Sequence, residues 1–363
     1  MMAAPAFVGR VLGKCLRIRE EDRVCIFTWN HTFDLAEAFA FECQKLGAKT
    51  HLEVETDKLY YQSVLDLPVK HLREANPFSL SLLDVATANI FISGPEDPDN
   101  LRKITPERMS ALVDGDKPYS TKFLEKRIRS VNIYLGHVTR QRARTYGFNY
   151  EKWNENVQAA IDVDYDFMQG SGRRIARMLE QASVVHITAE NGTDLTLELW
   201  NGVSRIDDGV VDDEDIRRGA VLTTLPAGNV AIVPREGSAS GVFVSDVPEA
   251  DSGLLIHDIS WRFKSGRLTS FTGGKNSEVI RKRWQVAKGN RDQASWLMIG
   301  LNPKAQGGYL YNNIVLGSVS LGIGDNRELG GRVESDFGAR CTILKPNVEL
   351  DERFVIRNGK LAL

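Results

Sequence analysis

The chain has 363 residues, of which 42% are hydrophobic and 26% are charged, and its formal net charge is −2. This length exceeds one ordinary domain and the composition is typical of a soluble globular protein, so we expect two domains. Without an excess of lysine and arginine, a nucleic-acid partner is not expected. No apolar run approaches the roughly 18 residues that a membrane-spanning helix needs, so no membrane partner is expected either.

The first half of the chain predicts an α/β domain. A short amphipathic helix is expected within residues 1–18, and a helix at 34–49 should bury Leu35, Ala38, Phe39, Cys43 and Leu46 and end near Gly47. The expected strands lie at 23–28, at 50–55, at the end of 82–93 and at 130–139. Alternation of strands and helices indicates a parallel sheet with covering helices. Two helices are expected within 146–182, closing a first domain at residues 1–182.

From residue 183 onward the pattern changes to short strands. SVVHITAENGTDLTLELW (183–200) predicts a hairpin around Asn191-Gly192. Five further segments have strand character, namely VAIVP, GVFVSD, LLIHDISWRF, RLTSFTG and CTILKP, with turns at 264–266 and 358–359. Residues 183–363 are therefore expected to form a β-rich second domain, and the acidic segment 207–219 an exposed loop.

The cysteines and histidines indicate no classical metal site. The four cysteines have no C-x-x-C spacing, which predicts reduced thiols in a cytoplasmic protein. The six histidines form no H-E-x-x-H or H-x-D pair. His31 directly follows the strand at 23–28, where α/β sheets bind ligands, although it could equally be exposed beside a helix cap formed by Thr32 or Asp34.

Residues 322–340, GIGDNRELGGRVESDFGAR, combine turn glycines with charged side chains. The spacing is not the G-x-G-x-x-G of a dinucleotide-binding loop, and no helix pattern follows it. The segment GSASG (237–241) is also not a G-x-S-x-G nucleophile turn. These glycines alone therefore predict turns between strands.

Four segments resemble one known superfamily in their order and spacing. They are LPAGNVAIVP (225–234), IGLNPKAQ (299–306), GSVSLGIGDNRELGG (317–331) and ESDFGARCTILKPNVELD (334–351). The superfamily contains the metal-dependent aminopeptidases of the T and S type and the iron-dependent 2,5-dihydroxypyridine dioxygenase. The resemblance implies an α/β N-terminal domain, a β-rich C-terminal domain that holds the site, and a homodimer.

The metal ligands that the resemblance implies are replaced. They fall at Asn229, near Trp296, at Ser320 and at the pair Gly338 and Arg340. Amide and hydroxyl oxygens cannot be the sole anchors of zinc or ferrous iron. Arg340 also adds a positive charge where a dication would lie. We therefore expect neither a bound metal nor another cofactor.

The first functional hypothesis is a metal-independent enzyme that acts on a small carboxylate- or amide-bearing molecule. Arg340 would bind a carboxylate or stabilise an oxyanion, and Asp325, Glu328 or Asp336 would act as general base. The expected substrate-binding residues are Asn229, Trp296, Asn302, Tyr309, Tyr311, Ser320 and Asn326.

Two alternatives remain open at this point. One is a metal-dependent aminopeptidase or ring-cleaving dioxygenase whose ligands have moved to Glu236, His257, Asp325, Glu328 or Asp336. The other is a non-catalytic binding or structural protein, in which Arg340 pairs with an acidic neighbour and fills the former metal cavity.

Overall fold

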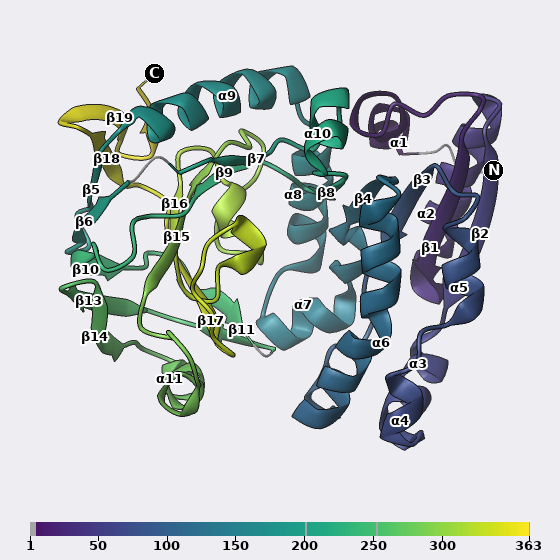
Figure 1. Cartoon of the computed structure of the whole chain (residues 1–363), viewed down its shortest axis with the longest axis horizontal. Helices are drawn as coiled ribbons and strands as arrows, with labels where there is room; N and C mark the ends of the chain where they lie inside the picture. The colour runs from purple at the N-terminus through teal and green to yellow at the C-terminus, as the bar shows by residue number, and fades with distance from the viewer. Residues whose placement is uncertain (1–4, 200–201, 252, 363) are drawn as a thin grey trace. The chain divides into compact units, whose positions relative to one another are not determined.

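A computed structural model describes residues 5–199, 202–251 and 253–362, and within them all side chains except those of Arg102, Pro106 and Glu328. The chain divides into two compact units (Figure 1). Unit 1 comprises residues 1–162 and 209–226, and unit 2 comprises residues 163–208 and 227–363. In the described ranges, no helix has both the length and the apolar character needed to cross a membrane.

Unit 1 contains a parallel five-stranded sheet in the order β2-β1-β3-β4-β8. Its strands are β1 (Arg23–Trp29), β2 (Lys49–Glu55), β3 (Ala88–Ile92), β4 (Arg129–Ile133) and β8 (Leu222–Leu225). This confirms the predicted α/β class. The strand expected at 130–139 stops at Ile133, because the 3-10 turn η4 (Tyr134–His137) follows it.

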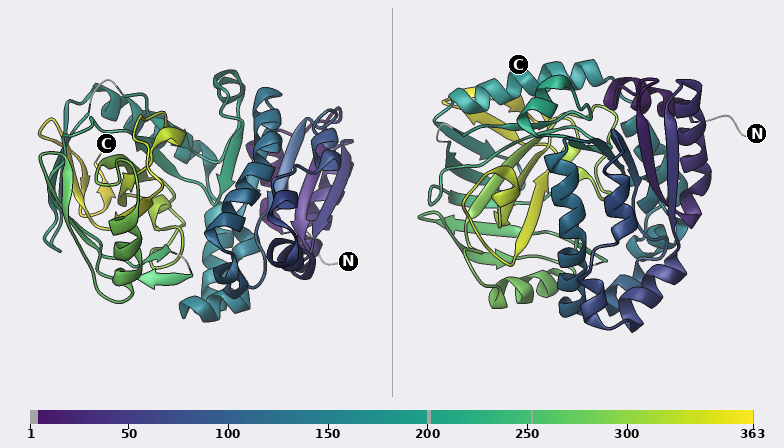
Figure 2. Two further views of the ribbon diagram at one scale, coloured as in Figure 1. Left: turned by 60° about the horizontal axis from the view of Figure 1, so that its bottom comes forward. Right: turned by 45° about the vertical axis from the view of Figure 1, so that its right-hand side comes forward.

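Helices lie alongside these strands (Figure 2). They are α1 (Ala6–Arg10), α2 (Phe33–Lys45), α3 (Asp57–Asp66), α4 (Val69–Leu72), α5 (Pro77–Leu82), α6 (Pro106–Glu125), α7 (Arg140–Tyr146), α8 (Tyr150–Ile161) and α10 (Asp213–Arg218). Shorter helical turns are η1 (Val11–Cys15), η2 (Asn30–Thr32) and η3 (Asp99–Lys103). Helix α2 contacts β1 and β2 and buries Phe39 and Cys43, as predicted. Leu46, which was expected on the same buried stripe, is instead 46% exposed, because the helix ends at Lys45. Gly47 follows with a φ of 89°, which favours glycine.

The acidic segment 207–219 is not simply the exposed loop that was expected, because it contains α10. The Asp212 carboxylate accepts hydrogen bonds from the backbone N–H groups of Glu214 and Asp215, and the Asp215 side chain accepts one from the Asp212 N–H. This reciprocal cap satisfies amides at the helix start, and Gly219 with a φ of 79° ends the helix. The acidic residues therefore start a helix here.

Unit 2 is built from two antiparallel sheets and a two-stranded ribbon. The eight-stranded sheet has the order β14-β13-β10-β6-β5-β18-β19-β20 and the five-stranded sheet has the order β17-β16-β15-β9-β7. The first comprises β5 (Val184–Thr188), β6 (Asp194–Glu198), β10 (Ser240–Val244), β13 (Ser260–Lys264), β14 (Arg267–Thr272), β18 (Asn347–Leu350), β19 (Arg353–Arg357) and β20 (Lys360–Leu361). The second comprises β7 (Arg205–Asp207), β9 (Asn229–Ile232), β15 (Ala294–Gly300), β16 (Val319–Gly324) and β17 (Gly338–Ile343). The ribbon pairs β11 (Glu249–Asp251) with β12 (Leu254–Ile256).

The remaining helices of unit 2 are α9 (Tyr165–Gln181) and α11 (Ser277–Val286), with the 3-10 turns η5 (Asn312–Ile314) and η6 (Arg327–Leu329). Helix α9 packs on β7 and β9. A Cβ atom on Gly172 would lie only 2.8 Å from the side chain of Ile206, so glycine lets the helix approach the sheet closely. Because of this packing, the expected boundary at 182/183 falls inside unit 2, after α9.

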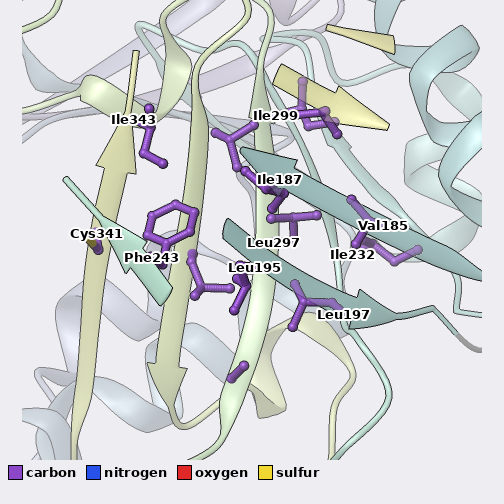
Figure 3. Close-up of a cluster of buried hydrophobic side chains, with 14 of the residues drawn as sticks. Val185, Ile187, Leu195, Leu197, Ile232, Phe243, Leu297, Ile299, Cys341 and Ile343 are labelled. Carbon is purple, nitrogen blue, oxygen red and sulfur yellow. The ribbon is translucent and has the colours of Figure 1, made fainter. Parts of the chain in front are cut away.

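The core of unit 2 lies between its two sheets. Figure 3 shows apolar side chains from β5, β6 and β10 pointing toward side chains from β9, β15 and β17. Leu297 and Ile299 on β15, with Cys341 and Ile343 on β17, are completely buried in this layer. Successive side chains of a strand point to opposite faces. From Trp296 onward in β15, and throughout β16 and β17, the even-numbered residues therefore lie on the opposite face of the five-stranded sheet, which we call the site face.

One buried ion pair joins strands of unit 1 to the segment that precedes them. Arg129 donates to the Asp22 carboxylate, which also accepts hydrogen bonds from the Thr87 hydroxyl at 2.6 Å and the Arg19 backbone N–H at 2.8 Å. Burial raises the pKa of Asp22, but these hydrogen bonds outweigh it, and the net pKa is lowered.

We predict that Asp22→Asn lowers the free energy of unfolding at pH 7 by about 3–5 kcal/mol, because the charge of Arg129 loses its buried partner. Since the folded-state pKa is lowered, this stabilisation is present above the unfolded pKa of about 3.9 and is lost as the pH falls through the folded value. Denaturant titrations from pH 7 to pH 3 should show the two proteins converging in acid.

The matched control is Glu151→Gln, which removes an ion pair with Arg140 whose side chains are 62% and 69% exposed. Exposed pairs contribute about 0–1 kcal/mol, so this change should be small. An Asp22 variant no less stable than the Glu151 variant would contradict the assignment.

Candidate functional site

A pocket of about 280 Å³ lies in unit 2 beside strand β17. Its walls come from β15, β17, the β11–β12 ribbon and α11. They are formed by Glu249, Ala250, Asp251, Ile256, Ile280, Trp296, Gly338, Ala339 and Arg340. The pocket thus brings together two carboxylates, a guanidinium and an indole from segments that are distant in sequence.

The strand register places Trp296 and Arg340 on either side of a glycine. Trp296 pairs with Gly322 across β15 and β16, and Gly322 pairs with Arg340 across β16 and β17. A Cβ atom on Gly322 would lie 1.9 Å from the Trp296 ring. The missing side chain therefore lets the indole lie across β16 toward Arg340.

Arg340 is held by three partners within unit 2. Its Nε donates to Glu249 Oε2 at 3.1 Å, its Nη1 to Asn313 Oδ1 at 2.9 Å, and its Nη2 to the carbonyl oxygen of Leu310 at 3.2 Å. An arginine has five N–H donors. Two of them therefore have no acceptor among the described residues, and the Arg340 side chain is 28% exposed.

Glu249 is the acidic partner of Arg340, and sequence reasoning missed it. Its side chain is only 5% exposed, and its Oε1 atom has no hydrogen-bond partner among the described residues. Cys341, on the core face of β17, is also affected by this carboxylate. Burial, and secondly the negative charge of Glu249, raise the pKa of the Cys341 thiol well above its usual value. A buried carboxylate oxygen without a donor is costly.

Asp325 and Asp336, two of the three acidic residues that were predicted as general bases, do not line this pocket. Asp325 accepts hydrogen bonds from the backbone N–H groups of Arg327 and Ser335 and forms an ion pair with the Arg327 side chain. Burial raises the pKa of Asp325, but these contacts outweigh it and lower the net pKa. Asp336 is exposed and accepts a hydrogen bond from the Lys288 backbone N–H. The Glu328 side chain lies outside the described residues.

The buried amides of Asn326 and Asn302 stabilise loops. Asn326 donates to the carbonyl oxygen of Ser295 at 2.9 Å and accepts from the Val333 N–H at 2.8 Å. Asn302 donates to the carbonyl oxygen of Ala227 and accepts from two backbone N–H groups in its own loop. Both side chains are almost completely buried, which favours a structural role.

The other expected binding residues lie at varying distances from the pocket. Ser320 is on the site face, but its hydroxyl is fully buried and pairs with the Thr342 hydroxyl at 2.8 Å. Asn229 pairs with Gly300 and is also on the site face, without lining the pocket. Tyr309 and Tyr311 are half-buried in the loop before η5 and do not line it either.

In unit 1, the side chain of His31 extends to the end of β4. Its Nε2 lies 2.9 Å from the carbonyl oxygen of Gly136, and its Nδ1 is buried with no partner in the described part of the chain. The hydrogen bond ties the loop after β1 to the turn after β4, and a ligand role for His31 stays a prediction.

The residues at the implied ligand positions do not fit a metal. Asn229, Ser320 and Arg340 do lie on one face of a single sheet, as the resemblance requires. Asn229, however, offers a metal ion only an amide, and the Ser320 hydroxyl is already paired with Thr342. The guanidinium of Arg340 has no lone pair with which to bind a metal ion. Within the described residues, no group of three or more His, Cys, Asp and Glu side chains comes together as a metal site would require.

We predict that Gly322→Ala lowers the free energy of unfolding by about 1–3 kcal/mol, because the added methyl group would overlap the Trp296 ring. Gly338→Ala is the matched control: this glycine also lines the pocket, yet the nearest atom to its added Cβ is 4.0 Å away. Its effect should stay within about 0.5 kcal/mol in the same denaturant titration. Equal stability of the two variants would show that the indole does not lie over Gly322.

Comparison with known proteins gives a consistent result for the fold. The structure is similar to that of AmpT from Thermus thermophilus, with a TM-score of 0.76, 16% sequence identity and 99% of each chain covered. It is also similar to 2,5-dihydroxypyridine dioxygenase from Pseudomonas putida KT2440, with a TM-score of 0.62, 17% identity, and 99% of this chain and 96% of that chain covered. No curated protein sequence gives a match. These likenesses confirm the predicted architecture.

The family assignment comes from the sequence. The family model described as thermophilic metalloprotease (M29) matches residues 7–292. The match covers most of the chain and ends just before Trp296, so the segments that carry Trp296, Ser320 and Arg340 lie beyond it. On this match, and in agreement with the resemblance of its C-terminal segments, the protein belongs to the thermophilic metalloprotease (M29) family.

Proposed function

We propose that unit 2 binds a small carboxylate- or amide-bearing molecule in the pocket beside β17 and acts on it by acid–base chemistry without a metal ion. One observation carries the proposal: a buried Glu249 carboxylate, with one unpaired oxygen, lies against Arg340 at the wall of an open pocket. A pocket with apolar walls and a few polar groups that converge in it is the usual form of a small-molecule site.

Each group has a chemical role in this proposal. The two remaining N–H groups of Arg340 would stabilise negative charge that develops on a carbonyl oxygen, as an oxyanion hole does. The free Oε1 of Glu249 would accept a proton from the substrate or from water. Trp296 and Ile280 supply the apolar walls. Glu249 thereby takes the role of base that the sequence had assigned to Asp325, Glu328 or Asp336.

A second candidate function is a non-catalytic binding or structural protein. It is favoured by the contacts of Arg340 to Glu249, Asn313 and Leu310, which hold the guanidinium without any ligand. A third is a metal-dependent aminopeptidase or dioxygenase with relocated ligands, which membership of the M29 family favours. The three differ in whether small molecules bind, and in whether that binding needs a metal.

The assembly and compartment are part of the same proposal. A homodimer is proposed because the resemblance implies one, and light scattering during size-exclusion chromatography measures it directly. A cytoplasmic location is supported by Cys25, Cys43 and Cys341, which are buried thiols without a disulfide among the described residues.

We predict that members of a panel of small amides and carboxylates raise the unfolding temperature of the protein in the presence of EDTA. A ligand at 100 times its Kd stabilises a protein by about 2.7 kcal/mol. Arg340→Ala should lose the effect, because the charge that orients the ligand is gone. Arg262→Ala, which removes an exposed arginine on β13, should retain it. Stabilisation that requires added zinc or iron would favour the metal-dependent alternative, and none at all would favour the structural one.

A further inference from the structure

The charged groups that line the pocket are already balanced. Glu249 pairs with Arg340, and Asp251, the other charged residue of the wall, pairs with Arg283 on α11. The carboxylates and guanidiniums therefore sum to zero net charge before any ligand enters. A charged ligand would leave an uncompensated charge in a pocket where one carboxylate is only 5% exposed.

The hydrogen-bonding groups left over are of both kinds. Glu249 Oε1 is an acceptor without a donor, and Arg340 has two N–H groups without an acceptor among the described residues. A ligand that satisfies both must present an N–H donor and an oxygen acceptor close together, because the two side chains touch each other at 3.1 Å.

A charged ligand can pair with either Glu249 Oε1 or the N–H groups of Arg340, but not with both. A carboxylate would meet the N–H groups of Arg340, but it offers no donor to Glu249 Oε1 and places a second negative charge beside that buried oxygen. An ammonium group would donate to Glu249 but would face the positive charge of Arg340. A neutral amide supplies the N–H and the carbonyl oxygen on adjacent atoms and adds no charge.

We infer that the pocket selects a neutral primary amide, carried on a planar apolar group that lies against the Trp296 ring. This inference rests on the proposed function and narrows its ligand class from carboxylate or amide to amide. The volume of about 280 Å³ lies near the lower end of ligand pockets, which fits a molecule of one ring. Ile256 and Ile280 provide the apolar surface opposite the indole.

Benzamide, benzoate and benzylamine test the inference, because they share one ring and differ in charge. Calorimetry or ligand-observed NMR with the full-length protein should show that benzamide binds at least about tenfold more tightly than benzoate or benzylamine, the factor expected when a buried group is left unpaired. Glu249→Gln gives the pocket a net positive charge, and in this variant benzoate should bind about tenfold or more tightly than benzamide. Asp336→Asn, outside the pocket, should keep the wild-type order.

The outcomes separate this inference from the proposed function. Preference of the wild-type protein for benzoate or benzylamine would overturn the amide inference and leave a ligand site in place. Binding of none of the three would overturn both. The wild-type order of affinities decides the question even if Glu249→Gln fails to fold, and circular dichroism identifies that case.

Discussion

The side chain of Arg340 lies against a buried carboxylate on a different segment of unit 2, and the electrostatics of the pocket depend on this contact. Glu249 is 5% exposed, so its charge would be costly without the guanidinium at 3.1 Å. Arg340 is 28% exposed, so solvent only partly screens its charge. The pair as a whole is neutral, and it leaves one carboxylate oxygen and two guanidinium N–H groups without a partner among the described residues. Those three properties decide which chemistry the pocket can support.

In the five-stranded sheet, successive side chains point alternately toward the core and toward the pocket, so different residues stabilise the fold and form the pocket. On β15, β16 and β17 one set of residues, including Leu297, Leu321 and Cys341, is buried against the eight-stranded sheet. The other set, including Trp296 and Arg340, lies on the site face. Side chains of the second set can change without creating a cavity in the core. This explains how a chain with only 16% identity to AmpT can share its architecture.

Local patterns made much of the fold predictable. Strand alternation, the helix stripe of Phe39 and Cys43 and the Asn191-Gly192 turn each depend on neighbours in sequence. The turn and both helix residues were found as expected, whereas the strand expected at 130–139 ends at Ile133. Trp296 and Arg340 were found through the resemblance, and both line the pocket. Helix α10 was missed because an acidic capping box was interpreted as a solvated loop.

Glu249 could not be predicted in the same way. It lies on a three-residue strand, and its partner is 91 residues later in the chain, so no local spacing connects them. Asp325 and Asp336, by contrast, are conspicuous among glycines in the sequence, but their carboxylates are used to hold backbone N–H groups. Acidic residues next to turn glycines often serve the turn itself. Burial and long-range pairing, which distinguish the two cases, are visible only in the structure.

We propose that the guanidinium–carboxylate pair of Arg340 and Glu249 takes the place of the metal centre that the family name implies. Elemental analysis of the purified protein, before and after incubation with zinc, cobalt and ferrous iron and removal of excess metal, tests it most directly. We predict metal far below one equivalent per chain in every case, and no change on Arg340→Ala. Near-stoichiometric metal would contradict the claim, and would direct attention back to aminopeptidase and dioxygenase chemistry.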